Sequence, residues 1–242
     1  MDRARFLNQR TFLIDAGSVF YGDEHFFALG ALPYAEVIVM QKYDVQALRP
    51  AEFHDGIQTL ETYLAVLTKA SIPIVESTFS FINVSAPIVP WTVVRRSISD
   101  PRCSERDQAI SVGVISLSPP IFLGRVLPSL KPLIHWRSGS TSDSARIAIA
   151  QMQRAHNGTI NKIVAITNRM FYDKEWLDDI ATNVHGIDVI HGGGTGTRLV
   201  YNALGDPVVM LDKPSMSNIV HLNALSSTQL VSSAIGKALL QR

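Results

Sequence analysis

The stretch DVIHGGGTGTRLVYNALGDPVVMLD, residues 188–212, carries the clearest information about the fold. It begins with a short apolar run, passes through a loop of glycines and threonines, and reaches a second apolar run at 208–211 after Gly205-Asp206-Pro207. Glycines let backbone amides approach an anion closely, and a helix that follows such a loop presents its positive end to the anion. We therefore expect a phosphate-binding loop followed by a short helix at 198–203. The residues expected to contact the phosphate are His191, Gly193, Gly194, Thr195, Gly196 and Thr197.

Outward from this stretch, apolar runs rich in Val and Ile alternate with segments whose apolar residues recur every three or four positions. The first pattern predicts strands and the second predicts helices. Their alternation indicates an α/β fold, in which helices cover both faces of a parallel sheet. Strands are expected at 11–14, 37–40, 72–75, 109–117, 133–136, 162–167, 187–190 and 208–211. Helices are expected at 23–32, 53–69, 142–155, 173–183, 198–203 and 218–240.

Prolines interrupt this pattern between residues 80 and 130, and the pattern returns from residue 133. We place a domain boundary at the end of the interruption, since composition shifts of this kind mark junctions. The sequence then predicts two Rossmann-like parallel-sheet units in series, residues 1–126 and 127–242. One large doubly wound sheet is the alternative reading of the same pattern.

Composition excludes several classes of protein. The 242 residues carry a formal net charge of +1, and the 22 basic residues are scattered, so no nucleic-acid partner is expected. The single cysteine cannot form an internal disulfide, and no run approaches the roughly 20 apolar residues of a membrane span. We expect a cytoplasmic protein without a transmembrane segment. A peripheral membrane contact, a protein partner and a homo-oligomer stay open.

Two further loops lie where a predicted strand ends and a helix begins, the place at which parallel α/β sheets bind ligands. The first contributes Gly17 and Ser18, and the second contributes Ser138, Gly139, Ser140 and Thr141. All six are candidate phosphate-binding residues, although Ser140 or Thr141 could equally be a helix cap.

Three residues near the first loop are candidate catalytic bases. Asp15 ends the first predicted strand, and Glu24 and His25 begin the helix that follows. A carboxylate or imidazole at that edge could accept a proton in a transfer or a hydrolysis reaction. No cluster of metal-ligating residues stands out, so no metal site is predicted.

The spacing of the opening stretch resembles the donor-binding half of GT-B glycosyltransferases, in particular the lipid II N-acetylglucosaminyltransferase family and its dolichol-pathway relatives. The resemblance rests on Thr197, on the Gly205-Asp206-Pro207 turn and on Asn223-Ala224. It implies a GT-B-like fold that binds a UDP-sugar between its units and transfers or hydrolyses the glycosyl group. Asn223 would position the donor, and no cofactor would be needed. Val200 stands where that family usually carries a glutamate.

A second resemblance leads to a different ligand. HWRSGSTSDSARIAIAQMQ, residues 135–153, followed by KIVAITN, residues 162–168, is similar to the sugar isomerase (SIS) domain, which implies a sugar phosphate as ligand. A third reading is a non-catalytic GT-B-like subunit or scaffold, which the valine at position 200 favours.

Overall fold

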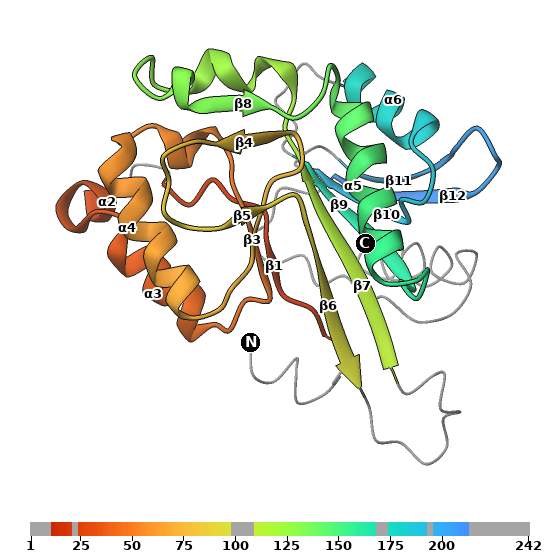
Figure 1. Ribbon diagram of the computed structural model, residues 1–242, viewed down its shortest axis with the longest axis horizontal. Coiled ribbons are helices and arrows are strands. Elements are labelled where there is room, and N and C mark those ends of the chain that lie inside the picture. The colour runs from red at the N-terminus through yellow and green to blue at the C-terminus, as the bar shows by residue number, and fades with distance from the viewer. Residues whose placement is uncertain (1–10, 21–23, 98–108, 168–173, 193–195, 213–242) are drawn as a thin grey trace.

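The computed structural model describes residues 11–20, 24–97, 109–167, 174–192 and 196–212. Two β-sheets lie face to face, with α2, α3 and α4 on one side and α5 and α6 on the other (Figure 1). The helices are α2 (Glu24–Leu29), α3 (Leu32–Met40), α4 (Gly56–Lys69), α5 (Thr141–Ala155) and α6 (Lys174–Asn183), with 3-10 turns at Pro50–Phe53, Pro120–Arg125 and Lys131–Leu133.

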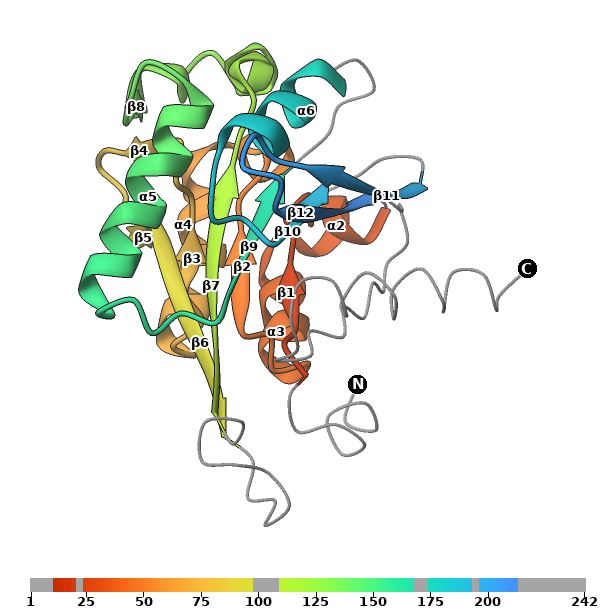
Figure 2. The ribbon, with the colours of Figure 1, turned by 90° about the vertical axis from the view of Figure 1, so that its right-hand side faces the viewer.

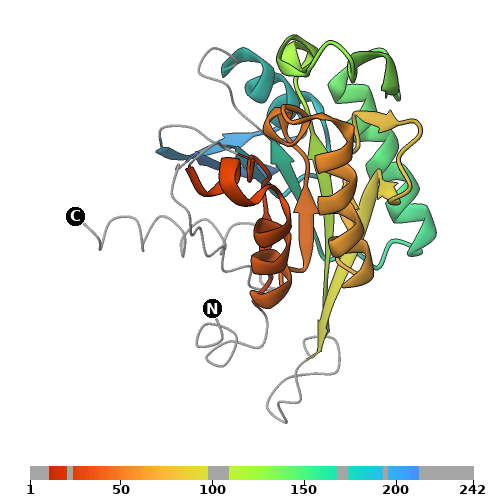
Figure 3. The same ribbon diagram turned by 90° about the vertical axis from the view of Figure 1, so that its left-hand side faces the viewer.

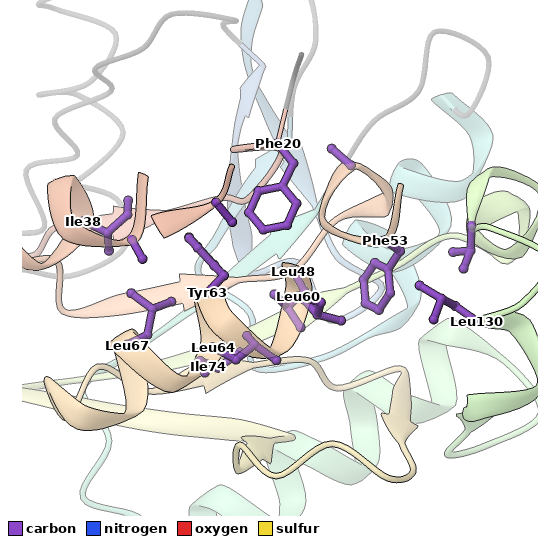
Figure 4. Close-up of a cluster of buried hydrophobic side chains, with 14 of the residues drawn as sticks. Phe20, Ile38, Leu48, Phe53, Leu60, Tyr63, Leu64, Leu67, Ile74 and Leu130 are labelled. Carbon is purple, nitrogen blue, oxygen red and sulfur yellow. The ribbon is translucent and has the colours of Figure 1, made fainter. Parts of the chain in front are cut away.

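The first sheet holds four of the described strands in the order β1-β2-β3-β5, and every neighbouring pair is parallel. Its strands are β1 (Ile14–Asp15), β2 (Val45–Ala47), β3 (Ile74–Val75) and β5 (Ile88–Val89). Helix α4 lies along its outer face (Figure 3) and places an apolar stripe against it. Leu60, Tyr63, Leu64 and Leu67 recur at three- and four-residue spacing and are fully buried, as the helical period requires (Figure 4).

The second sheet holds six described strands in the order β11-β12-β10-β9-β7-β6. Its central pairs are parallel, whereas β6 and β11 are antiparallel edge strands. Helices α5 and α6 cover its outer face (Figure 2). The strands are β6 (Trp91–Ser97), β7 (Ala109–Leu117), β9 (Lys162–Thr167), β10 (Val189–Gly192), β11 (Gly196–Tyr201) and β12 (Pro207–Asp212).

Strand β7 shows why the two sheets stack. Its side chains alternate between faces, as in any strand. Val112 and Val114 point between the sheets, where they join a cluster that includes Val45 and Val75 of the first sheet. Ile115 belongs to the opposite cluster beneath α5 and α6. The six-stranded sheet is therefore apolar on both faces and is covered on both.

A short two-stranded sheet, β4 (Phe79–Phe81) and β8 (Ile134–Trp136), bridges the end of the first sheet to the start of α5. The expected strand at 133–136 thus exists, but it pairs antiparallel with β4 instead of joining a parallel sheet.

Two expected elements have the wrong type. Residues 37–40, expected as a strand because of their Val and Ile run, are the last turns of helix α3. In that helix Ala35 and Ile38 are buried three residues apart, so packing against the core overrides the β-propensity of the run.

The helix expected at 198–203 is the strand β11, which pairs antiparallel with β12. The turn between them is closed by Asn202, whose Oδ1 accepts hydrogen bonds from the backbone amides of Leu204 (3.0 Å) and Asp206 (2.9 Å). Gly205 has a φ of +83°, which favours glycine at this turn. The segment is therefore a β-hairpin.

The α/β class is confirmed, and the division at residues 126 and 127 stays a prediction. Strands β6 and β7, placed with the first unit in that division, share their sheet with β9, β10 and β12. Asn223 and the helical segment expected at 218–240 lie outside the described residues. In the part of the chain that the structure describes, no helix is long and apolar enough to cross a membrane.

Candidate functional site

The carboxyl ends of β2, β3 and β7 meet at one edge of the stacked sheets. The backbone amide of Ser77, just past β3, donates to the carbonyl of Ser116 in β7 (2.8 Å). Ser118 donates its amide to Thr78 Oγ1 (2.9 Å). This edge is where α/β sheets bind ligands, so the polar residues gathered here form the candidate site.

Arg49 lies at the centre of this edge and is only 1% exposed. Its Nη1 donates to the carbonyl of Leu48 (2.8 Å) and to Ser116 Oγ (3.0 Å), which joins the first sheet to the second. Its Nε and Nη2 have no hydrogen-bond partner among the described residues. Burial lowers the pKa of the guanidinium, while the charges of Glu76, Glu52 and Asp15 raise it. Arg49 is thus a buried cation placed among three acids.

Glu76 is fully buried directly after β3. One carboxyl oxygen accepts the amide of Thr78 (2.8 Å), and the other accepts the hydroxyls of Ser118 (2.9 Å) and Ser116 (3.4 Å). Burial raises the pKa of Glu76 to about 7, and the positive charge of Arg49 opposes that rise.

Glu52 occupies the first predicted phosphate-binding loop. Its carboxylate accepts the backbone amides of Ser18 and Val19, the latter at 2.5 Å, and the amide of Arg49 (2.7 Å). Gly17 (φ +81°) and Ser18 (φ +67°) turn these amides inward. Burial raises the pKa of Glu52 to about 7. The loop does bind an anion, but the anion is a carboxylate of the same chain.

Asp15, the expected base, lies in this cluster. Its Oδ1 accepts the amide of Gly17 (2.7 Å) and Gln46 Nε2 (3.0 Å), and burial raises its pKa. The other two expected bases lie elsewhere. Glu24 is exposed at the first residue of α2, and the side chain of His25 is outside the described part.

The second loop serves the chain itself. Ser140 caps α5, since its Oγ accepts the amide of Asp143 (3.0 Å), as the helix-cap interpretation expects. Ser138 donates its hydroxyl to the carbonyl of Ser140 (2.7 Å), and Thr141 donates to the carbonyl of Ser118 (3.1 Å). Gly139 has no heavy atom within 4 Å of the place a Cβ would take. Thr141 thus brings this loop next to the Arg49 edge.

The third loop differs most from expectation. His191 lies within β10, where its carbonyl accepts the hydroxyl of Thr167 (3.4 Å). Gly196 and Thr197 lie in β11, so the element that follows this loop is a strand and not the expected helix. Gly193, Gly194 and Thr195 are outside the described residues.

Arg49, Glu52 and Glu76 were not predicted as site residues. A sequence signal exists for Glu76, which directly follows the apolar run expected as a strand at 72–75. Arg49 has no such signal, because Gln46 interrupts the segment before it and no strand was expected there. Nothing in the sequence shows that these two residues lie close together, since 27 positions separate them and the contact is made between neighbouring strands.

No protein family model and no curated protein matches the chain. Solved structures do match its fold. A 5'-nucleotidase precursor from Thermus thermophilus superimposes with a TM-score of 0.67 and 21% identity, over 87% of this chain and 41% of that one. The NAD nucleotidase of Haemophilus influenzae gives 0.65 and 17%, over 87% and 42%. A calcineurin-like phosphoesterase from Bacillus subtilis gives 0.62 and 21%, over 88% and 70%. The chain thus spans about two-fifths of the first two structures.

These likenesses correct the earlier expectations. The resemblances to GT-B glycosyltransferases and to SIS domains are wrong, because the structures that share this fold are named as nucleotidases and phosphoesterases. The glycosyl transfer from a UDP-sugar and the sugar-phosphate isomerisation drawn from those resemblances are wrong with them. The expectation of no cofactor is contradicted at the level of the shared fold, since calcineurin-like phosphoesterases typically use a dimetal centre.

The described side chains do not fit such a centre. Among them, no group of three or more His, Cys, Asp or Glu residues is placed to hold a metal ion. At the edge where the strands end, Glu52 and Glu76 direct both carboxyl oxygens toward N–H and O–H donors of the chain. The buried guanidinium of Arg49 supplies the positive charge there. A second cation beside it would be repelled.

Proposed function

We propose that this chain binds a nucleotide, or another small phosphate ester, at the carboxyl ends of its two sheets. In this proposal Asp15, Glu52 and Glu76 do not hold a pair of metal ions. The observation that carries the proposal is the buried guanidinium of Arg49 among these three acids. The ligand class is supported by the fold, which this chain shares with structures named as nucleotidases.

The phosphate is proposed to lie beyond the ends of β9 and β10, next to residues 193–195. Both strands end there at the edge of the sheet, and Thr167 and His191 are in adjacent positions. The glycines and the threonine of that segment can offer backbone amides and a hydroxyl to phosphate oxygens. The Arg49 cluster, at the ends of β2 and β3, stays a fixed part of the scaffold, because its carboxylates are already hydrogen-bonded within the chain.

Calorimetry with AMP, ADP and NAD, in EDTA and again with Mn²⁺, tests the proposal together with an assay for released phosphate. We expect a nucleotide to bind in EDTA, and we expect its Kd to change by less than about threefold when Mn²⁺ is added. No phosphate should be released. Hydrolysis that requires added metal would overturn the metal-free part. Absence of binding by all three nucleotides at millimolar concentration would overturn the ligand class.

A pair of threonine variants locates the ligand. Thr195→Val removes a hydroxyl of the proposed phosphate loop and is expected to weaken nucleotide binding by about tenfold. Thr62→Val, on the exposed face of α4, is the matched control, since its hydroxyl donates only to the carbonyl of Gln58 (2.9 Å). Equal weakening in both variants would contradict the placement.

A further inference from the structure

A pocket of about 340 Å³ lies between the segment after β3, the β4-β8 pair and α5. Figure 2 shows how α5 lies beside β4 and β8. Its volume is at the small end of the range for ligand pockets. We propose that it is a separate binding site for a small organic oxyanion, a carboxylate or a phosphate monoester, held by Arg137 and Gln151. The pocket is lined by Ser77, Ser80, Pro90, Arg137, Ser144, Ile147, Ala148 and Gln151.

Charge favours an anion here. Arg137 is the one charged residue among those that line the pocket. Its Nε donates to the carbonyl of Phe79 (3.1 Å), which fixes the plane of the guanidinium. Within the described part of the chain, its two terminal nitrogens make no hydrogen bond or ion pair. A guanidinium held in this way can donate two parallel hydrogen bonds to a carboxylate or phosphate.

Two of the serine hydroxyls that line the pocket, those of Ser77 and Ser144, already donate their protons within the chain. Ser138 donates to the carbonyl of Ser140 (2.7 Å), so in the contact between Ser138 and Ser144 (2.7 Å) the proton comes from Ser144. Ser77 donates to the carbonyl of Pro90 (2.5 Å) and accepts the amide of Ser116 (3.1 Å).

Two donor groups therefore remain for a ligand, the terminal nitrogens of Arg137 and the amide of Gln151. Gln151 is exposed on α5, and among the described residues its side chain has no hydrogen-bond partner. The hydroxyl of Ser80 can add a third donor, because its hydrogen bond to the carbonyl of His135 is long, at 3.5 Å. Pro90, Ile147 and Ala148 add apolar surface to the lining, and Ile147 is 46% exposed. The pocket thus suits a ligand that combines an oxyanion with a short apolar part.

The site is tested by titrating the full chain with succinate and with inorganic phosphate. Calorimetry measures the affinity, and backbone amide shifts locate the bound probe. Arg137→Gln is expected to weaken binding of the preferred probe by about tenfold, with shifts in the wild type centred on Ser77, Ser80 and Ser144. Arg154→Gln, which changes an exposed arginine near the end of α5, is the matched control and is expected to bind like the wild type. The stronger of the two probes identifies carboxylate or phosphate as the ligand group.

The proposal would be overturned if Arg137→Gln bound the probe as tightly as the wild type. It would also be overturned if neither probe bound at 10 mM, which corresponds to about 3 kcal/mol of affinity, or if the amide shifts were confined to residues 167–192. Gln151→Ala keeps the test valid if Arg137→Gln is unfolded, because position 151 is exposed. It is expected to weaken binding by about threefold. The site does not depend on nucleotide binding at the Arg49 edge, since Thr195→Val is expected to leave it unchanged.

Discussion

Arg49 determines what the carboxyl ends of the strands can hold. Its guanidinium lies among Asp15, Glu52 and Glu76, all of which have a raised pKa because they are buried. A buried carboxyl group without a partner favours the neutral form, and the nearby cation partly restores the charged form. Glu52 and Glu76, whose pKa values are about 7, therefore gain or lose a proton near neutral pH.

This cluster makes stability depend on pH. Because the pKa of Glu76 is about 7 in the folded chain and about 4.5 when it is unfolded, the folded state binds more protons between these values. The free energy of unfolding contributed by Glu76 is then greatest below pH 4.5, falls as pH rises, and levels off above pH 7. Urea unfolding at pH 5, 6, 7 and 8 should show a smaller fall in Glu76→Gln than in the wild type. A fall of the same size in both would contradict the assignment, and Glu61→Gln on α4 is the control.

At the scale of elements, α5 and β11 show opposite outcomes. The helix expected at 142–155 is present as α5, because its cap and its apolar spacing are both local features. Residues 198–203 also suggested a helix, but they form β11 because β12 offers a partner strand across a five-residue turn. An edge strand depends on that partner, which local spacing does not reveal.

The cap of α5 can be measured directly. Ser140→Ala removes the oxygen that accepts the amide of Asp143, and it is expected to lower the free energy of unfolding by about 1 kcal/mol. Ser140→Thr retains an acceptor oxygen, and its free energy of unfolding should fall by less than half of that amount. Chemical unfolding of both variants checks the prediction, and an equal loss would show that the cap contributes nothing.

At the scale of the whole molecule, two of the contacts that join the stacked sheets differ in kind. One is the apolar layer between them, which includes Val45, Val75, Val112 and Val114. The other is the polar edge, where Arg49 of the first sheet reaches Ser116 of the second. Apolar burial supplies most of the stabilisation, while the polar edge fixes how the strand ends meet.

Arg49→Met tests the polar edge. It removes the hydrogen bonds to Leu48 and Ser116 and takes the buried cation away from Glu52 and Glu76, so the free energy of unfolding at pH 8 should fall by about 3 kcal/mol. The loss should be smaller at pH 5, where Glu52 and Glu76 are neutral. Arg154→Met, on the exposed face of α5, is the control and should change stability by less than about 0.5 kcal/mol. A loss independent of pH would argue against a role for charge.

The sequence by itself determined the α/β class, the strands at 109–117 and 162–167, and the long helices α4 and α5, because each rests on a periodicity or a cap within one segment. Only the tertiary structure decided that residues 37–40 are helical and 196–201 extended, since packing partners overrode local propensity. It also decided that Glu52 fills the first predicted phosphate loop, that Arg49 bonds Ser116, and that the charges of Arg49 and Glu76 interact. Those contacts join residues far apart in the chain, and their register is set by the pairing and stacking of whole sheets.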